Sequence, residues 1–95
     1  MNEKINISDY TKGMIKFDRC FDFESLLNFG FNLENLVTLN PNDRTETEIQ
    51  TFRYNEIKTV RIVTEVETHS EGTLTYQSLY IYEKDKPYFE KLNKK

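Results

Sequence analysis

The fold is decided by residues 46–83, which read ETEIQTFRYNEIKTVRIVTEVETHSEGTLTYQSLYIYE. This stretch is rich in Thr, Val, Ile and Tyr and contains no Pro, a composition typical of β-strands. It predicts three consecutive strands, over residues 47–54, 57–68 and 73–83. Because only residues 69–72 separate the last two strands, they are expected to form a β-hairpin with a four-residue loop. The centre of the chain therefore predicts an antiparallel meander.

Two short helices are predicted before this meander. Asp22 is suited to cap the first helix and Gly30 to end it. The second helix is predicted from Asn32 to the Asn-Pro pair at 40–41, because apolar side chains there have helical spacing; these are Leu33, Leu36 and Val37. Helices of two or three turns are not stable alone, so we expect residues 22–39 to rest on the sheet.

The two ends of the chain complete the expected fold. Residues 1–20 have mixed character and would fit one or two short strands. Residues 86–93 follow a capping Asp85 and contain an early Pro87, which predicts a terminal helix. The sequence as a whole predicts a single domain over residues 1–95 of the α+β class, an antiparallel β-meander of three or more strands packed on one face by short helices.

Composition excludes several classes of protein. The 95 residues carry 13 basic and 16 acidic side chains, a net charge of −3. No apolar run approaches the roughly 18–20 residues of a membrane span, and the N-terminus has no secretion signal, so we expect a cytoplasmic protein with no membrane partner. The single cysteine cannot form an internal disulfide.

The residues that bind metals and phosphates are sparse. Cys20 and His69 are the only cysteine and histidine, so a zinc site would need carboxylates for its other ligands. Residues 40–51 begin with alternating oxygen ligands, but Thr45 stands where a calcium loop requires Gly and Thr51 where it requires Glu. The three glycines are scattered and build no phosphate-binding loop. We therefore expect no metal and no cofactor.

Two groups of residues are catalytic candidates. Cys20 with His69 is the only thiol and imidazole pair, but a lone cysteine is more often a small buried side chain. Asp18, Asp22 and Glu24 form an acidic cluster that is better explained as a favourable helix start. The sequence therefore predicts that the protein is not an enzyme.

The predicted hairpin divides its side chains between two faces. With a loop at 69–72, paired residue numbers add up to 141. This register places Val60 opposite Ile81 and Ile62 opposite Leu79, on an aliphatic face suited to carry the helices. The other face then gathers tyrosines and polar side chains, namely Tyr76, Tyr80, Tyr82, Thr59, Arg61 and Glu65.

This second face is the candidate binding site. Tyr and Arg are enriched at protein-binding hot spots, because a Tyr ring buries a large area and Arg offers a planar fork of donors. The set Arg61, Tyr76, Tyr80, Tyr82, Thr59 and Glu65 is therefore predicted to contact a partner. The alternative is that these tyrosines merely suit a strand surface, or that the N-terminal segment or the terminal helix covers them.

The predicted function is a non-enzymatic protein-binding module, of the kind that a phage or plasmid encodes as an inhibitor or accessory protein. The alternative is nucleic-acid binding, either by a winged-helix-like arrangement or by stacking on single strands. Residues 45–83 disfavour this alternative, because seven acidic side chains oppose three basic ones. Exposed strand edges also make a second copy of the chain a candidate partner, in a homodimer.

Overall fold

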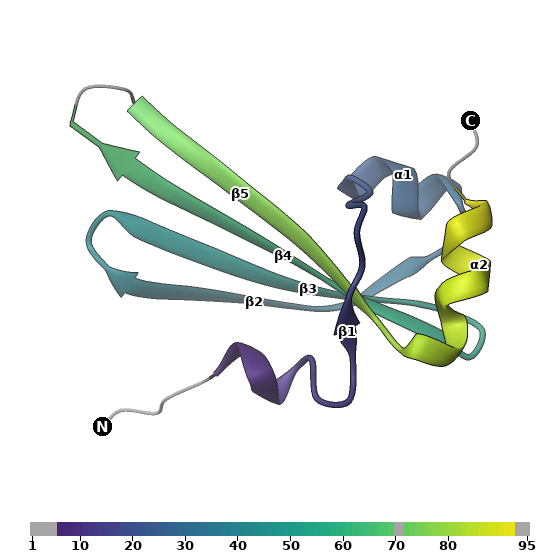
Figure 1. Cartoon of the computed structure of the whole chain (residues 1–95). Coiled ribbons are helices and arrows are strands. Elements are labelled where there is room, and N and C mark those ends of the chain that lie inside the picture. The colour runs from purple at the N-terminus through teal and green to yellow at the C-terminus, as the bar shows by residue number, and fades with distance from the viewer. Residues whose placement is uncertain (1–5, 70–71, 93–95) are drawn as a thin grey trace.

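A computed structural model describes residues 6–69 and 72–92, which form one antiparallel sheet with short helices (Figure 1). The strands are β1 (Ile15–Lys16), β2 (Asn32–Asn42), β3 (Thr45–Tyr54), β4 (Ile57–Thr68) and β5 (Gly72–Ile81). The helices are α1 (Phe23–Asn28) and α2 (Lys86–Lys91), with 3-10 turns η1 (Ile7–Asp9) and η2 (Glu83–Asp85). The strand order β1-β5-β4-β3-β2 confirms the predicted α+β meander.

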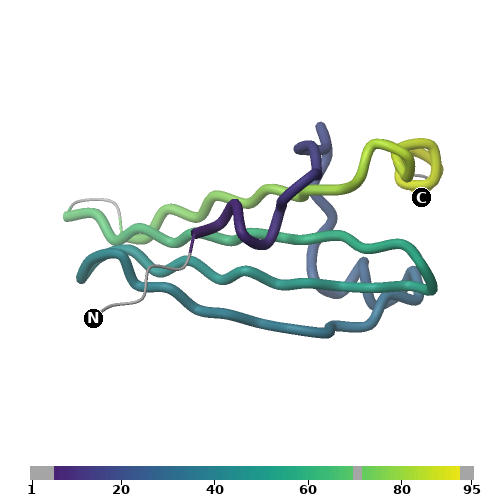
Figure 2. Tube along the Cα trace, turned by 90° about the horizontal axis from the view of Figure 1, so that it is seen from below, coloured from purple at the N-terminus to yellow at the C-terminus, as the bar shows by residue number. Residues whose placement is uncertain are grey.

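The long strands run from one end of the molecule to the other (Figure 2). The turns that join β2 to β3 and β4 to β5 lie at one end, which we call the hairpin end. Both α-helices and the tight turn between β3 and β4 lie at the other end (Figure 1). In that turn Asn55 has a φ of 56°, a left-handed conformation that Asn tolerates better than most residues.

Two clusters of buried side chains hold the fold together. The larger cluster contains Leu26 of α1 and Phe89 of α2, together with residues from the sheet and the connecting segments; these are Phe17, Phe31, Phe52, Leu79 and Ile81. Phe23 of α1 packs edge-on against Phe52 of β3, with ring centroids 5.3 Å apart. The smaller cluster consists of Ile49, Val60 and Ile62, and Tyr10 and Met14 of the N-terminal segment pack against it.

Several predicted elements are confirmed. Helix α1 begins after Asp22, whose carboxylate accepts a hydrogen bond of 2.9 Å from the Ser25 backbone N–H. The chain leaves α1 through Gly30, whose φ of 103° is a conformation that favours glycine. Strand β4 has the predicted bounds, and α2 carries Pro87 in its first turn.

The second predicted helix is wrong, because residues 32–42 form the edge strand β2. A β-bulge explains the error. Leu33 pairs with Phe52 and Leu36 with Gln50, while the register shifts between Leu33 and Asn35. In a regular strand, residues three apart point to opposite faces, but the extra residue of the bulge returns Leu33 and Leu36 to the same face. The spacing therefore imitates one side of a helix.

The predicted register of the β4–β5 hairpin is also wrong, by one residue. Thr68 pairs with Gly72 rather than with Thr73, and paired numbers add up to 140 rather than 141. Gly72 adopts a φ of 81°, which allows it to be the first residue of β5 rather than the last of the loop. Because side chains alternate between faces, this slip changes which residues of β4 share a face with those of β5.

Candidate functional site

The corrected register defines two faces of the sheet. Arg61 lies opposite Leu79 and shares its side with Phe52, Thr59 and Ile81; we call this side the arginine face. The other side is the tyrosine face, where Tyr80 lies opposite Val60, Tyr76 opposite Thr64, and Ile62 opposite Ile49. The predicted site is therefore divided. Its tyrosines of β5 lie on one face, whereas Thr59, Arg61 and Glu65 lie on the other.

Arg61 is a buried structural residue, with only 6% of its surface exposed. Its Nε donates to the backbone carbonyl of Phe21 over 2.9 Å, and its Nη1 donates to Oε1 of Gln50 over 2.9 Å. Its Nη2 donates to Oε1 of Gln77. The guanidinium thus joins strands β3, β4 and β5 to the segment that leads into α1. It has no free surface to offer a partner.

Most of the other predicted contact residues are also covered. Thr59 has no exposed surface, and its hydroxyl donates to the Tyr80 carbonyl over 2.8 Å. Tyr80 is half-buried against the smaller cluster, and Tyr82 is half-buried with the Lys84 ammonium 5.9 Å from its ring centroid. Tyr76, with 58% of its surface exposed, is the one tyrosine of the predicted set that is largely open to solvent.

The open part of the arginine face carries four glutamates, which we call the glutamate patch. Glu46 and Glu48 come from β3, and Glu65 and Glu67 from β4. Glu46 lies directly opposite Glu65, and Glu48 lies opposite Val63. All are exposed except Glu48, which is half-buried and accepts a 2.8 Å hydrogen bond from the Gln50 side chain. The patch lies toward the hairpin end, away from the helices (Figure 1).

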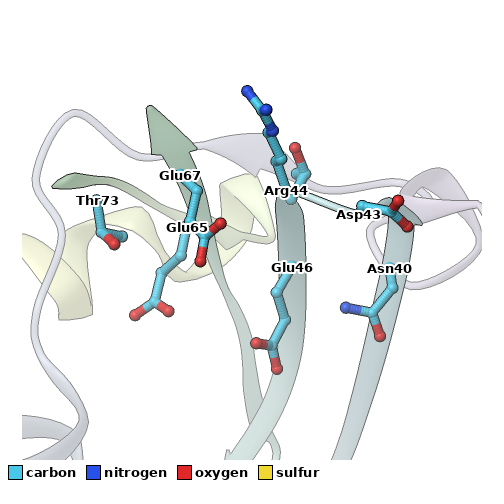
Figure 3. Close-up of a pocket in the computed structure, with 8 residues that line it drawn as sticks. Asn40, Asp43, Arg44, Glu46, Glu65, Glu67 and Thr73 are labelled. Atoms are coloured by element: carbon cyan, nitrogen blue, oxygen red, sulfur yellow. The ribbon is translucent and has the colours of Figure 1, made fainter. Parts of the chain in front are cut away.

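These glutamates have no cationic partner among residues 6–69 and 72–92, where no Lys or Arg nitrogen lies within 4.0 Å of their carboxylates. Arg44 is near in sequence, but its side chain points away from Glu46 (Figure 3). Its Nη1 lies 2.7 Å from Nε2 of His69 instead. At the hairpin end the surface has a hollow of about 150 Å³, whose lining includes Glu46, Glu65 and Glu67 as well as Asp43 and Arg44.

The carboxylates of the patch are spread along the strands rather than gathered around one point. In the described part of the chain, no group of three or more His, Cys, Asp or Glu side chains is arranged to hold a metal ion. The patch therefore suits a ligand with several positive charges better than a single bound cation.

The catalytic candidates lie in different surroundings. Cys20 is exposed rather than buried, and desolvation raises the pKa of its thiol more than the neighbouring Arg61 guanidinium lowers it, so the thiol is protonated at neutral pH. His69, in contrast, contacts Arg44 at the hairpin end. Hydrogen bonds from Ser25 hold the pKa of Asp22 below its usual range, as expected of a helix cap.

Comparison of the chain with protein-family models, with curated proteins and with solved structures finds no match. A function for this surface must therefore follow from its own geometry and charge. Among the described residues, no helix is long and apolar enough to cross a membrane.

The glutamate patch was not predicted from the sequence, although the short turn between residues 54 and 57 would have indicated it. Tyr54 pairs with Ile57 across a two-residue turn, so paired numbers in the β3–β4 hairpin add up to 111. That sum brings Glu46 opposite Glu65. Alternating glutamates on both strands then fall on one face. The prediction assigned a register to the β4–β5 hairpin alone and so included Glu65 without its neighbours.

Proposed function

We propose that the protein is a non-enzymatic protein-binding module that docks a basic partner on the glutamate patch. The observation that carries this proposal is the facing pair Glu46 and Glu65, with Glu48 and Glu67 beside it and, among the described residues, no Lys or Arg nitrogen within 4.0 Å of their carboxylates. This is the same class of function that the sequence predicts, a protein-binding module. The proposed contact surface, however, is the acidic part of the arginine face rather than the tyrosines.

Charge repulsion within the patch supports this proposal. Like charges directly opposite each other on neighbouring strands destabilise a sheet, by a few tenths of a kcal/mol where both are exposed. Glu46 and Glu65 have this arrangement. A basic partner would relieve the repulsion and would also be steered toward the patch during diffusional encounter. The same glutamates would repel phosphate groups, so the proposal does not extend to nucleic acid.

The test compares two variants with the same loss of charge. The double variant Glu46→Gln with Glu65→Gln neutralises the facing pair. The double variant Glu56→Gln with Glu90→Gln removes two exposed charges at the opposite end of the molecule, where the α-helices lie. Each immobilised protein captures partners from a lysate of its host, and the affinity of each captured partner is then measured with purified protein. We expect about tenfold weaker binding for the first variant, from two ion pairs of roughly 0.7 kcal/mol each. The second variant should bind like the wild type.

Stability provides a second readout of the same variants. Removal of the facing charges should raise the melting temperature by about 1–2 °C, because roughly 0.3 kcal/mol of repulsion is lost. A variant that is more stable but binds less well would show that the glutamates serve recognition. Equal binding by both variants, or capture of acidic partners alone, would contradict the proposal.

A further inference from the structure

The outer edge of β2 has no neighbouring strand in the described part of the chain. Strand order places β2 at the end of the sheet, where Asn32–Asn42 pairs with β3 on one side only. Backbone N–H and C=O groups along such an edge form a template for another extended strand. An occupant of this edge must therefore supply a strand.

Residues 35–39 of this edge carry none of the features that protect natural edges from pairing. They read NLVTL and contain no charge, no Pro, no Gly and no register shift. Edge strands are commonly protected by lysines, prolines or bulges. In β2 the register shifts lie outside this stretch or at its end, between Leu33 and Asn35 and between Leu39 and Asn42, and Pro41 follows. Among the described residues, the regular segment between them, Asn35–Leu39, has no strand on its outer side.

We propose that β2 pairs with β2 of a second copy, so that the protein is a homodimer with one continuous sheet. The absence of unpaired charge along the edge allows a second copy to approach there. The only charged residue of β2 is Glu34, whose carboxylate lies 2.8 Å from Nε of Arg53. Two chains of net charge −3 repel each other over most of their surface, but at this edge no like charges meet. A basic partner is attracted to the glutamate patch instead.

The geometry of such a pair follows from symmetry. Identical antiparallel edges are related by a two-fold axis perpendicular to the sheet, so each face of one copy continues into the same face of the other. Centring the pair on Val37 uses the whole regular segment and places Leu36 opposite Thr38 of the partner subunit. Both glutamate patches then lie on the same side of the dimer.

Exposed leucines beside the edge support the same interface. Leu33 and Leu36 lie on the arginine face and are 38% and 43% exposed, and Leu27 of the adjoining α1 is 43% exposed. Large apolar side chains that gather at one edge commonly mark an interaction site. Pairing would bring Leu36 against the other copy, with Leu33 and Leu27 close to the new junction.

Light scattering coupled to size-exclusion chromatography tests the proposal. The monomer mass is 11.4 kDa, and the wild type should have twice this mass. The variant Leu36→Lys with Thr38→Lys changes two exposed side chains. In the dimer, the lysine at position 36 of each copy would lie opposite the lysine at position 38 of the other copy, so that like charges repel at two places. Its mass should fall by half, while circular dichroism shows an unchanged sheet.

The matched control places two lysines on the part of β5 that lies beyond its short pairing with β1, as Leu74→Lys with Tyr76→Lys, where both side chains are also exposed. This control should remain a dimer. A monomeric wild type, or a Leu36→Lys with Thr38→Lys variant that remains dimeric, would overturn the proposal. Dissociation of the β5 control would overturn it as well, because it would indicate head-to-tail pairing of β2 with β5. None of these results depends on the partner of the glutamate patch.

Discussion

Replacement of Arg61 by Met is expected to destabilise the protein by about 3 kcal/mol. The substitution keeps a long apolar stem but removes the donors to the Phe21 carbonyl, Gln50 and Gln77. Each buried acceptor left without a donor costs about 1–3 kcal/mol, which applies to the Phe21 carbonyl and to Gln50, whereas the exposed Gln77 can bond to water. The relief from no longer burying a charge offsets part of this sum. For two buried acceptors this gives about 2–6 kcal/mol, and we expect about 3 kcal/mol because the Gln50 side chain can turn to a new partner, whereas the backbone carbonyl cannot.

Urea unfolding followed by far-ultraviolet circular dichroism measures this change. A loss of about 3 kcal/mol corresponds to a melting temperature about 12–24 °C lower for a domain of this size. Arg53→Met is the matched control, because Arg53 forms a half-exposed ion pair with Glu34 that is worth at most about 1 kcal/mol. If the Arg61 variant were as stable as the Arg53 variant, Arg61 would be a surface residue and the register described above would be wrong.

Two further predictions concern the segment around α1. Gly30→Ala should cost about 1–3 kcal/mol in urea unfolding, because φ is 103° and a Cβ would lie 3.2 Å from the Tyr54 ring. Gly72→Ala, with φ of 81° and no atom within 4 Å of its Cβ, should cost less; an equal cost would exclude the ring contact as a cause. The pKa of Asp22 is lowered in the folded state, so its stabilisation is present above the unfolded pKa of about 3.9 and is lost as pH falls through the folded value. Asp22→Asn retains a capping side chain that does not titrate, so its stability should fall less steeply below about pH 4; an unchanged slope would rule out this role.

The elements that could be predicted were those with a strong local signal. Residues 57–68 alternate β-branched and polar side chains between two turns, and Asp22 and Gly30 bracket α1 with a cap and a left-handed residue. Strand β2 could not be predicted in the same way. The bulge at 33–35 reproduces helical spacing, and only pairing with β3 shows that the segment is extended.

The candidate site was harder to predict because it depends on register. One residue of error in the 69–72 loop moved Arg61 to the face of Tyr80, although the two point to opposite sides of the sheet. Gly72 sets the register of the β4–β5 hairpin, since its left-handed conformation allows it to pair with Thr68. Sequence composition correctly indicated a local excess of acid in the strands, but not that Glu46 and Glu65 face each other.

Amide chemical-shift mapping of a captured partner on the ¹⁵N-labelled protein tests the location of the binding surface most directly. The proposed docking on the glutamate patch predicts that the largest shifts fall on residues 46–50 of β3 and 63–67 of β4, and that they diminish when salt is added. Shifts confined to Tyr76, Tyr80 and Tyr82, or to α2, would contradict it.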